Sequence, residues 1–250
     1  FIFFCNNELY YRYLQVIENK FVKEHNLERR SKKFTCLNRA DKAHRKIYAS
    51  YMYTMDILKH GYFSYTGYKN HTSHKGLDDV SQWIDFDDSL QQDLFGFELN
   101  VPFYCDDLSD SEHNNHKLVN HDFFRDAYFN FVVETHFDNN TCFLTEKTFK
   151  PILNLQPFII IGNPGSLRLL RDLGYKTFHD VIRETYDDEQ DHKQRMTSLL
   201  KISYDLTQLT DKHHIRIQHI ISDVLKHNQQ HFLSPKVNRI NELLNKLKYQ

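Results

Sequence analysis

Strand-like and helix-like segments alternate between residues 128 and 178, and this order constrains the fold more than any other feature of the sequence. The predicted elements are, in chain order, a strand at 128–133, a helix that begins at Thr145, a continuous apolar strand at 157–162, a helix at 167–173 and a strand at 175–178. A strand that is apolar throughout is typical of a sheet covered on both faces. Strands that alternate with helices at these lengths form parallel sheets. The predicted fold class is therefore α/β, with a Rossmann-like parallel sheet.

A similar unit is expected earlier in the chain. Residues 34–37 are predicted to form a buried strand, and Asp41 is predicted to be the N-cap of the helix that follows. Gly61 is expected to stop this helix at its carboxyl end. Segments 67–93 and 106–121 are polar and irregular, so we expect surface loops there.

The two ends of the chain complete the predicted organisation. A short strand is expected at 1–5 and a helix at 8–23, whereas the sequence after residue 205 is helical. Two apolar stripes in the carboxyl-terminal part indicate packing surfaces. They consist of Ile217, Ile220, Ile221, Val224 and Leu225, and of Val237, Ile240, Leu243, Leu244 and Leu247. We therefore divide the chain into an initial segment at 1–32, an α/β domain at 33–205 and C-terminal helices at 206–250.

The charge and the cysteines exclude several classes of protein. The formal net charge is -1, which gives no general attraction to nucleic acids. No apolar run reaches the ~20 residues that span a bilayer, so no membrane span is expected. The four cysteines are scattered without CxxC spacing, which argues against a zinc ribbon and favours reduced thiols in a cytoplasmic protein.

Polar and charged side chains follow the predicted strands where these strands end. They are Asn38, Arg39 and Arg45 after the first strand, Glu134 after the second, and Thr145, Glu146 and Lys147 at the start of the next helix. In open α/β sheets, ligands bind outside the carboxyl ends of the strands, where helix N-termini present N–H groups. A diphosphate there would meet a helix dipole and two or three cations, which stabilise a leaving nucleotide without a metal.

Two segments of the sequence carry a resemblance to a known family. Residues 34–48 and 129–178 resemble the C-terminal domain of a family of phage, giant-virus and bacterial glycosyltransferases. They are also similar, more distantly, to the α1,3-fucosyltransferases, in which a strand ending in F-E-N/T is followed by T-E-K and then by a P-V-V-x-G strand. The resemblance covers most of 33–186 in order and spacing. It implies the C-terminal half of a GT-B enzyme that transfers a sugar from a nucleotide-sugar donor without a metal or other cofactor.

The resemblance also implies roles for individual residues. Glu146 and Lys147 of T-E-K correspond to the residues that contact the ribose and phosphate of the donor, and Arg45 to an arginine that contacts the diphosphate. Glu134 occupies the position of the glutamate near the reacting sugar, so we expect it to be catalytic. The nucleotide-sugar-binding domain would then be 33–205. A viral protein of this kind would act in the host cytoplasm.

The sequence departs from the fucosyltransferase pattern at two places. Val133, Glu134 and Thr135 replace F-E-N/T, which argues against GDP-fucose as the donor. The segment at 1–32 is much shorter than an acceptor-binding domain of ~100 residues. We expect it to be the remnant of such a domain in a fragment, or else the acceptor is held differently. The acceptor, whether a glycan, a lipid or a modified base, stays unassigned.

Other interpretations compete with this one. Asp85 and Asp87 form a D-x-D pair that could chelate a divalent metal, and two histidine pairs have a spacing that zinc accepts. These pairs are His71 with His74 and His113 with His116. Solvated loops are the simpler explanation of all three motifs. The alternatives to a glycosyltransferase of general type are a non-catalytic nucleotide-binding module and a glycosyltransferase that modifies DNA bases.

Overall fold

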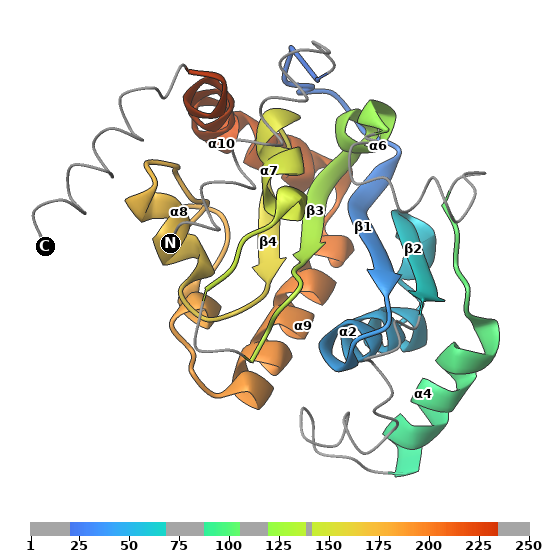
Figure 1. Ribbon diagram of the computed structural model, residues 1–250. Coiled ribbons are helices and arrows are strands. Elements are labelled where there is room, and N and C mark those ends of the chain that lie inside the picture. Colours follow the sequence, from blue (N-terminus) through green and yellow to red (C-terminus); the bar gives the residue numbers. More distant parts are fainter. Residues whose placement is uncertain (1–20, 69–87, 106–119, 139–141, 235–250) are drawn as a thin grey trace, which may run out of the picture.

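A four-stranded parallel sheet forms the centre of the computed structural model (Figure 1), which describes residues 21–68, 88–105, 120–138 and 142–234. The strands are β1 (Lys32–Ala40), β2 (Gly61–Tyr68), β3 (Ala127–Val133) and β4 (Phe158–Ile161). Their order in the sheet is β2-β1-β3-β4, and every neighbouring pair is parallel. All residues of β3 and β4 are buried, as expected for a sheet covered on both faces. The predicted α/β, Rossmann-like fold is confirmed.

Helices connect the strands and cover the sheet. They are α2 (Ala43–Thr54), α4 (Asp88–Asn100), α6 (His121–Asp126), α7 (Glu146–Leu153), α8 (Ser166–Asp172), α9 (His192–Gln208) and α10 (Asp211–Leu233), with short 3-10 helices η1 (Leu58–His60) and η2 (Thr185–Asp187). The C-terminal helices of the predicted fold class are thus present. Among the described helices, none is long and apolar enough to cross a bilayer.

The chain reverses its direction across the sheet between β1 and β3. From β1 it crosses through α2 to β2 at one edge, and from β3 it crosses through α7 to β4 at the other edge. Since parallel crossovers are right-handed, α2 and α7 lie on opposite faces of the sheet (Figure 1). The carboxyl ends of β1 and β3 therefore flank a topological switch point, the place where open α/β sheets bind ligands.

Two predicted boundaries around α2 are wrong. The N-cap is Lys42 rather than Asp41, because the Asp41 carboxylate accepts a hydrogen bond from the Tyr65 hydroxyl at 2.7 Å instead of capping the helix. The helix ends at Thr54, and Asp56 then adopts a left-handed conformation with φ 55. Gly61 therefore begins β2 rather than stopping a long helix. The structure also has α4 within and beyond the segment at 67–93 that was expected to be irregular.

The strand predicted at 175–178 does not form. Its backbone is satisfied by side chains instead of a neighbouring strand: Asn228 of α10 accepts from the Lys176 N–H and donates to the Lys176 carbonyl, both at 2.8 Å. The Phe178 N–H donates to the Glu184 carboxylate. The preceding helix, α8, begins one residue earlier than predicted, with Gly165 at its N-cap in a left-handed conformation (φ 79).

Only part of the apolar stripe predicted at 217–225, which lies on α10, is buried in the protein. Ile221 and Leu225 are buried, whereas Ile220 is half-exposed. The helix is also fastened to the sheet by polar contacts, since Gln218 donates to the Tyr128 carbonyl of β3 at 3.1 Å. The elements predicted at 1–5 and in most of 8–23, and the second stripe at 237–247, lie outside the described residues. Cys36, Cys105 and Cys142 form no disulfide bond.

Candidate anion-binding site

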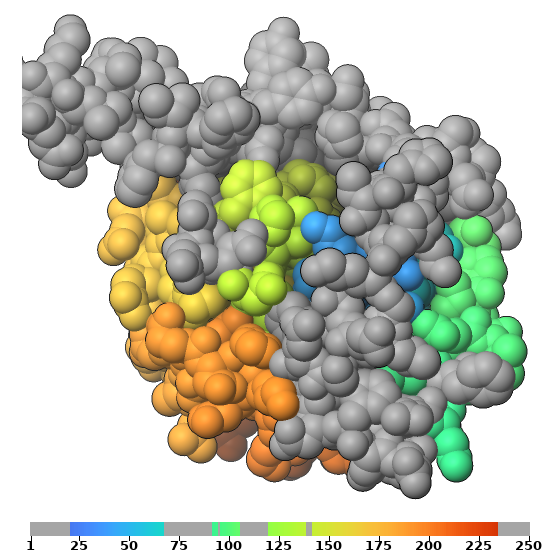
Figure 2. Space-filling view, turned by 60° about the horizontal axis from the view of Figure 1, so that its bottom comes forward, coloured from blue at the N-terminus to red at the C-terminus, as the bar shows by residue number. Residues whose placement is uncertain are grey.

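The candidate site lies at the carboxyl end of the sheet, beside the switch point. All four strand arrows point to the bottom of Figure 1, and Figure 2 looks onto this end. There, blue atoms from the early part of the chain lie beside yellow-green atoms from the part around β3, with orange atoms from the part around α9 next to the yellow-green (Figure 2). Segments that are far apart in the sequence therefore meet at this surface.

Glu134 is the buried centre of the site. Its carboxylate accepts hydrogen bonds from the Thr145 N–H at 2.9 Å, the Thr145 hydroxyl at 2.7 Å and the Thr148 hydroxyl at 2.7 Å. The residue is 0% exposed. Thr145 is the N-cap of α7, as predicted, and accepts from the Lys147 N–H. Glu134 therefore ties the end of β3 to the start of α7, where a carboxylate is favoured by the helix dipole.

Three basic side chains from the start of α2 reach the main chain that follows β3. Arg45 and His44 donate to the Glu134 carbonyl at 3.1 Å and 3.0 Å, and Lys42 donates to the Thr135 carbonyl at 2.9 Å. Arg45 is 4% exposed, and its Nε has no hydrogen-bond partner. Burial, reinforced by the charge of Arg45, lowers the pKa of His44 to about 3, so this imidazole is neutral at pH 7.

Lys147 and Glu146 form a partly exposed pair at the start of α7. The Lys147 ammonium donates to the Thr145 hydroxyl and to the Glu146 carboxylate, both at 3.1 Å. Burial alone would raise the pKa of Glu146, but the charges of Lys147 and Lys150 outweigh it and lower this pKa. Burial lowers the pKa of Lys150 to about 8. Glu146 is therefore an ionised acceptor beside an available ammonium group.

The cations at this edge are close enough to repel one another. Burial is the largest cause of the lowered pKa of Lys42, and the charges of Arg45 and Lys147 lower this pKa further. Burial also lowers the pKa of Arg45. Within the described part of the chain, no carboxylate lies within ion-pair distance of Lys42 or Arg45, which bind neutral carbonyl groups instead. Lys42 and Arg45 therefore lack an ion-pair partner among the described residues, although the charge of Asp138 acts on Lys42 and those of Glu134 and Glu146 act on Arg45. We call Lys42, Arg45 and Lys147 the cation cluster.

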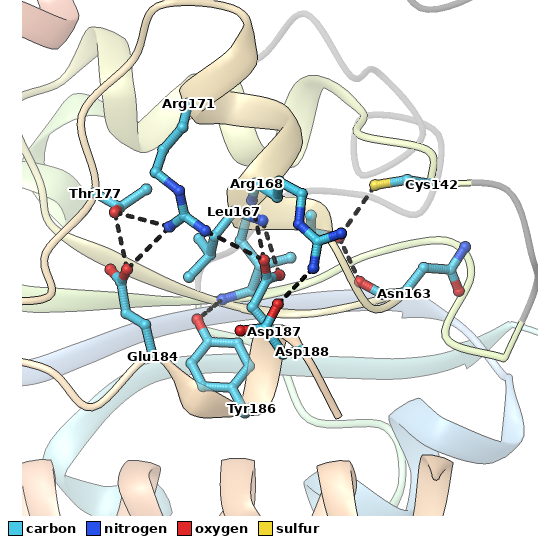
Figure 3. A network of polar contacts seen from close by, with 12 residues as sticks. Cys142, Asn163, Leu167, Arg168, Arg171, Thr177, Glu184, Tyr186, Asp187 and Asp188 are labelled. Carbon is cyan, nitrogen blue, oxygen red and sulfur yellow. Dashed lines mark hydrogen bonds and ion pairs between the residues drawn. The ribbon is translucent and has the colours of Figure 1, made fainter. Parts of the chain in front are cut away.

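The helix that starts at the cation cluster lacks a cap. The N-cap Lys42 makes no side-chain capping hydrogen bond, and the first turn of α2 contains no acidic residue. In contrast, α7 begins against Glu134 and Thr145, and α8 begins against Asp187. The Asp187 carboxylate accepts from the Leu167 N–H at 2.8 Å and the Arg168 N–H at 2.9 Å (Figure 3). Of these three helix starts, that of α2 has neither a capping N-cap side chain nor an acidic first turn, which suits an anion from outside.

The structure brings some of the predicted site residues together and places others elsewhere. The structure brings Glu134, Arg45, Thr145, Glu146 and Lys147 together through the contacts above. Asn38 and Arg39 lie near the end of β1 on the side of β2: Thr66 of β2 donates to the Arg39 carbonyl at 2.9 Å. Asn38 is buried, and its amide donates to the Cys36 sulfur, whereas its Oδ1 has no hydrogen-bond partner.

Four residues of this region were not predicted from the sequence. Lys42 and His44 precede Arg45 at the same helix start. Their short distance from Arg45 in the sequence could have indicated that they belong to the site. No pattern in the sequence indicates that Phe137 and Arg195 belong to this region. Phe137 follows β3 and is buried; His44 stacks on its ring at 5.6 Å, and the Arg195 guanidinium of α9 lies over the ring at 4.4 Å. Arg195 also donates to the Phe137 carbonyl. These contacts hold the segment after β3 against α2 and α9.

The metal-binding alternatives cannot be placed in the site. Asp85, Asp87 and the histidine pairs at 71/74 and 113/116 lie outside the described residues. Within the described ranges, no group of three or more histidine, cysteine, aspartate or glutamate side chains could hold a metal ion.

Comparison with known proteins adds no relative. No protein-family model, no curated protein and no solved structure matches the chain.

Proposed function

We propose that the chain binds a nucleotide-activated sugar at the carboxyl end of its sheet and belongs to a glycosyltransferase. The diphosphate of the donor would lie at the uncapped start of α2 and be bound by the cation cluster. The observation that carries this proposal is a contrast between helix starts. The N-cap side chain of α2 makes no capping hydrogen bond, and Lys42 and Arg45 beside it have no ion-pair partner among the described residues, whereas α7 and α8 start against buried carboxylates. A site of this kind suits two adjacent phosphate groups.

The contacts of the other residues favour particular roles. Glu146 is an ionised, partly exposed carboxylate that can accept hydrogen bonds from ribose hydroxyls beside Lys147. Glu134 was expected to be catalytic, but a fully buried carboxylate that already accepts from Thr145 and Thr148 is better suited to positioning. Its carbonyl group orients Arg45, and its carboxylate fixes the start of α7. We therefore assign Glu134 a positioning role in the proposed site.

The proposed reaction needs only charge stabilisation from this chain. The bond between the anomeric carbon and the diphosphate oxygen breaks, and the nucleoside diphosphate leaves with the electron pair. An acceptor oxygen or nitrogen forms the new bond to the anomeric carbon, and its proton passes to a base. The cation cluster would stabilise the charge that develops on the diphosphate, which is the role that a metal plays in other transferases. The base and the acceptor stay unassigned.

Binding of the donor can be tested with the purified chain. The melting temperature is measured with UDP-, GDP-, ADP-, CMP- and dTDP-sugars at millimolar concentration, since a ligand that binds the folded state raises it by mass action. We expect one nucleotide to stabilise the chain and Lys42→Ala and Lys147→Ala to reduce its affinity about tenfold each. Lys201→Ala is the matched control, because Lys201 lies on α9 and is 77% exposed. No stabilisation by any donor would overturn the proposal.

Transfer is tested separately from binding. The donor that binds is incubated with the chain, and release of the nucleoside diphosphate is followed, since sugar transfer to water or to an added acceptor releases it. Release that disappears in Lys147→Ala supports the enzyme. Tight binding with no release under any acceptor would instead favour a non-catalytic nucleotide-binding module.

A further inference from the structure

A cavity lies at the same end of the sheet, next to the cation cluster. Its volume is about 290 Å³, and it lies between the segment after β3, the turn from β4 to α8 and the start of α9. The side chains that line it and matter for its chemistry are Asp138, Arg168, Gln190, His192 and Arg195. The predictions made from the sequence assigned none of them to a site.

The cavity and the cation cluster share a wall. Asp138 follows Phe137, whose ring contacts His44 of α2 and Arg195 of α9. The charge of Asp138 acts on Lys42 on one side and on Arg195 on the other. Asp138 therefore lies between the two regions, and a ligand that has its phosphates at the start of α2 and another group in the cavity would pass this residue.

The chemistry of the cavity differs from that of the cation cluster. The charge of Arg168 is compensated by an ion pair with Asp188 at 2.5 Å. Arg195 is 1% exposed, and its guanidinium donates to the Phe137, Glu189 and Gln190 carbonyls, while its Nε has no hydrogen-bond partner. Asp138 adds a carboxylate. The cavity thus combines hydrogen-bond donors with the Asp138 carboxylate, which would repel another phosphate.

The size and lining of the cavity select among the parts of a nucleotide sugar. Drug-sized ligands occupy about 300–1,000 Å³, so the cavity suits a single ring rather than a nucleoside with its phosphates. A nucleobase needs an apolar or aromatic surface to stack on, but Pro164 is the only apolar side chain among the described lining residues. A ring that carries several hydroxyl groups needs carboxylate acceptors and amide or guanidinium donors, which this cavity provides.

From these observations we infer that the cavity binds the sugar of the donor, with the Asp138 carboxylate accepting from two of its hydroxyl groups. This inference rests on the proposed function, because it requires the diphosphate at the start of α2. It assigns to Asp138 a contact with the transferred sugar and to Gln190 and His192 the selection among sugars. The residues that bind the diphosphate and those that bind the sugar are thereby distinct.

The test compares a nucleotide with and without its sugar. Calorimetric affinities are measured for the nucleoside diphosphates UDP, GDP, ADP and dTDP, and then for the glucose, galactose, mannose and N-acetylglucosamine derivatives of the one that binds. Asp138→Asn is expected to lower the affinity for the preferred nucleotide sugar at least tenfold and the affinity for the bare nucleoside diphosphate less than twofold. Gln190→Ala should change the ratio of affinities among the sugars. Asp180→Asn is the matched control, since Asp180 is 68% exposed and lies outside the cavity.

The outcomes separate the inference from the proposed function. If Asp138→Asn lowers the affinity for the nucleoside diphosphate as much as that for the nucleotide sugar, or lowers neither, the sugar does not lie in this cavity. The proposed diphosphate site is not contradicted by this result. If no nucleoside diphosphate or nucleotide sugar binds the folded chain, the proposed function and the inference fall together. Melting curves of each variant show that the change in affinity does not come from unfolding.

Discussion

The starts of α2 and α8 lie at the same end of the sheet and are built in opposite ways. At α8, the buried Asp187 accepts from two N–H groups of the first turn (Figure 3). Glu184 and Tyr186 in the same segment accept from the backbone N–H groups of Phe178 and Ile160. At α2, the N-cap is a lysine whose side chain makes no capping hydrogen bond, and the first turn contains no acidic residue. The first turn of α8 is capped by a carboxylate of the chain itself, whereas the start of α2 carries two cations, Lys42 and Arg45, that have no ion-pair partner among the described residues.

The difference has a cost in stability that function can explain. A side-chain cap stabilises a helix by about 0.5–2 kcal/mol, and burying Arg45 lowers its pKa. Proteins retain such unfavourable arrangements mainly at sites that bind or react. An anion at the start of α2 would supply there what Asp187 supplies to α8. Substitutions at the two kinds of helix start should therefore have different effects on stability and on binding.

The largest effect is expected at the carboxylate that begins α7. Glu134→Ala removes the acceptor of three buried donors, so we expect a loss of about 3 kcal/mol or more in the free energy of unfolding. Denaturant unfolding measures this loss. Glu134→Gln keeps the shape and one acceptor oxygen, so it should cost less than Glu134→Ala. A loss below 1 kcal/mol in Glu134→Ala would show that Glu134 does not hold β3 to α7.

A smaller loss is expected at the cap of α8. Asp187→Ala leaves two N–H groups of a buried helix start without their acceptor, at a cost of about 2 kcal/mol. Because the contacts of Asp187 are with Leu167, Arg168 and Arg171 rather than with the cation cluster, affinity for the bare nucleoside diphosphate should stay within about twofold of the wild type, provided that the variant is folded. A variant that loses nucleotide binding while it remains folded would contradict the division between the two helix starts.

The start of α2 should make the free energy of unfolding of the chain depend on pH, because it contains the buried His44, which has no counterpart at α8. Its pKa is about 3 in the folded chain, below the ordinary value of about 6.5. The unfolded chain therefore takes up the proton first, so stability is retained above about pH 6.5 and is lost as the pH falls toward 3. Between pH 6.5 and 5 the loss from this group is about 2 kcal/mol. His44→Gln keeps a donor and should reduce the measured loss by that amount; an unchanged pH dependence would mean that His44 is not held neutral.

The sequence predicts the part of the sheet whose elements are stabilised locally. The strand before Glu134 and the cap at Thr145 follow from apolar runs and from a threonine directly before an acidic first turn. The strand expected at 175–178 fails because Asn228, far along the chain, satisfies its backbone. Such long-range partners leave no pattern in the local sequence.

The same distinction applies to the candidate site. Arg45, Glu146 and Lys147 could be predicted because they follow strands or begin a helix, where ligands of parallel sheets bind. The absence of a cap on α2 could not be predicted, because Asp41 precedes the helix and looks like an N-cap. Only the structure shows that Asp41 accepts from Tyr65 of β2 instead. Arg195 likewise gains its place from the packing of α9 on Phe137.

The central claim is that the start of α2 is kept uncapped for an anionic ligand, and Lys42→Asp tests it most directly. Aspartate at the N-cap should convert α2 into a helix start like that of α8 and raise the free energy of unfolding by about 1 kcal/mol relative to Lys42→Ala. The measurement is the affinity for pyrophosphate and for the nucleotide that stabilises the wild type, with unfolding of the same samples. We predict a more stable protein that binds neither ligand detectably. Unchanged affinity in a folded, more stable Lys42→Asp variant would contradict the claim.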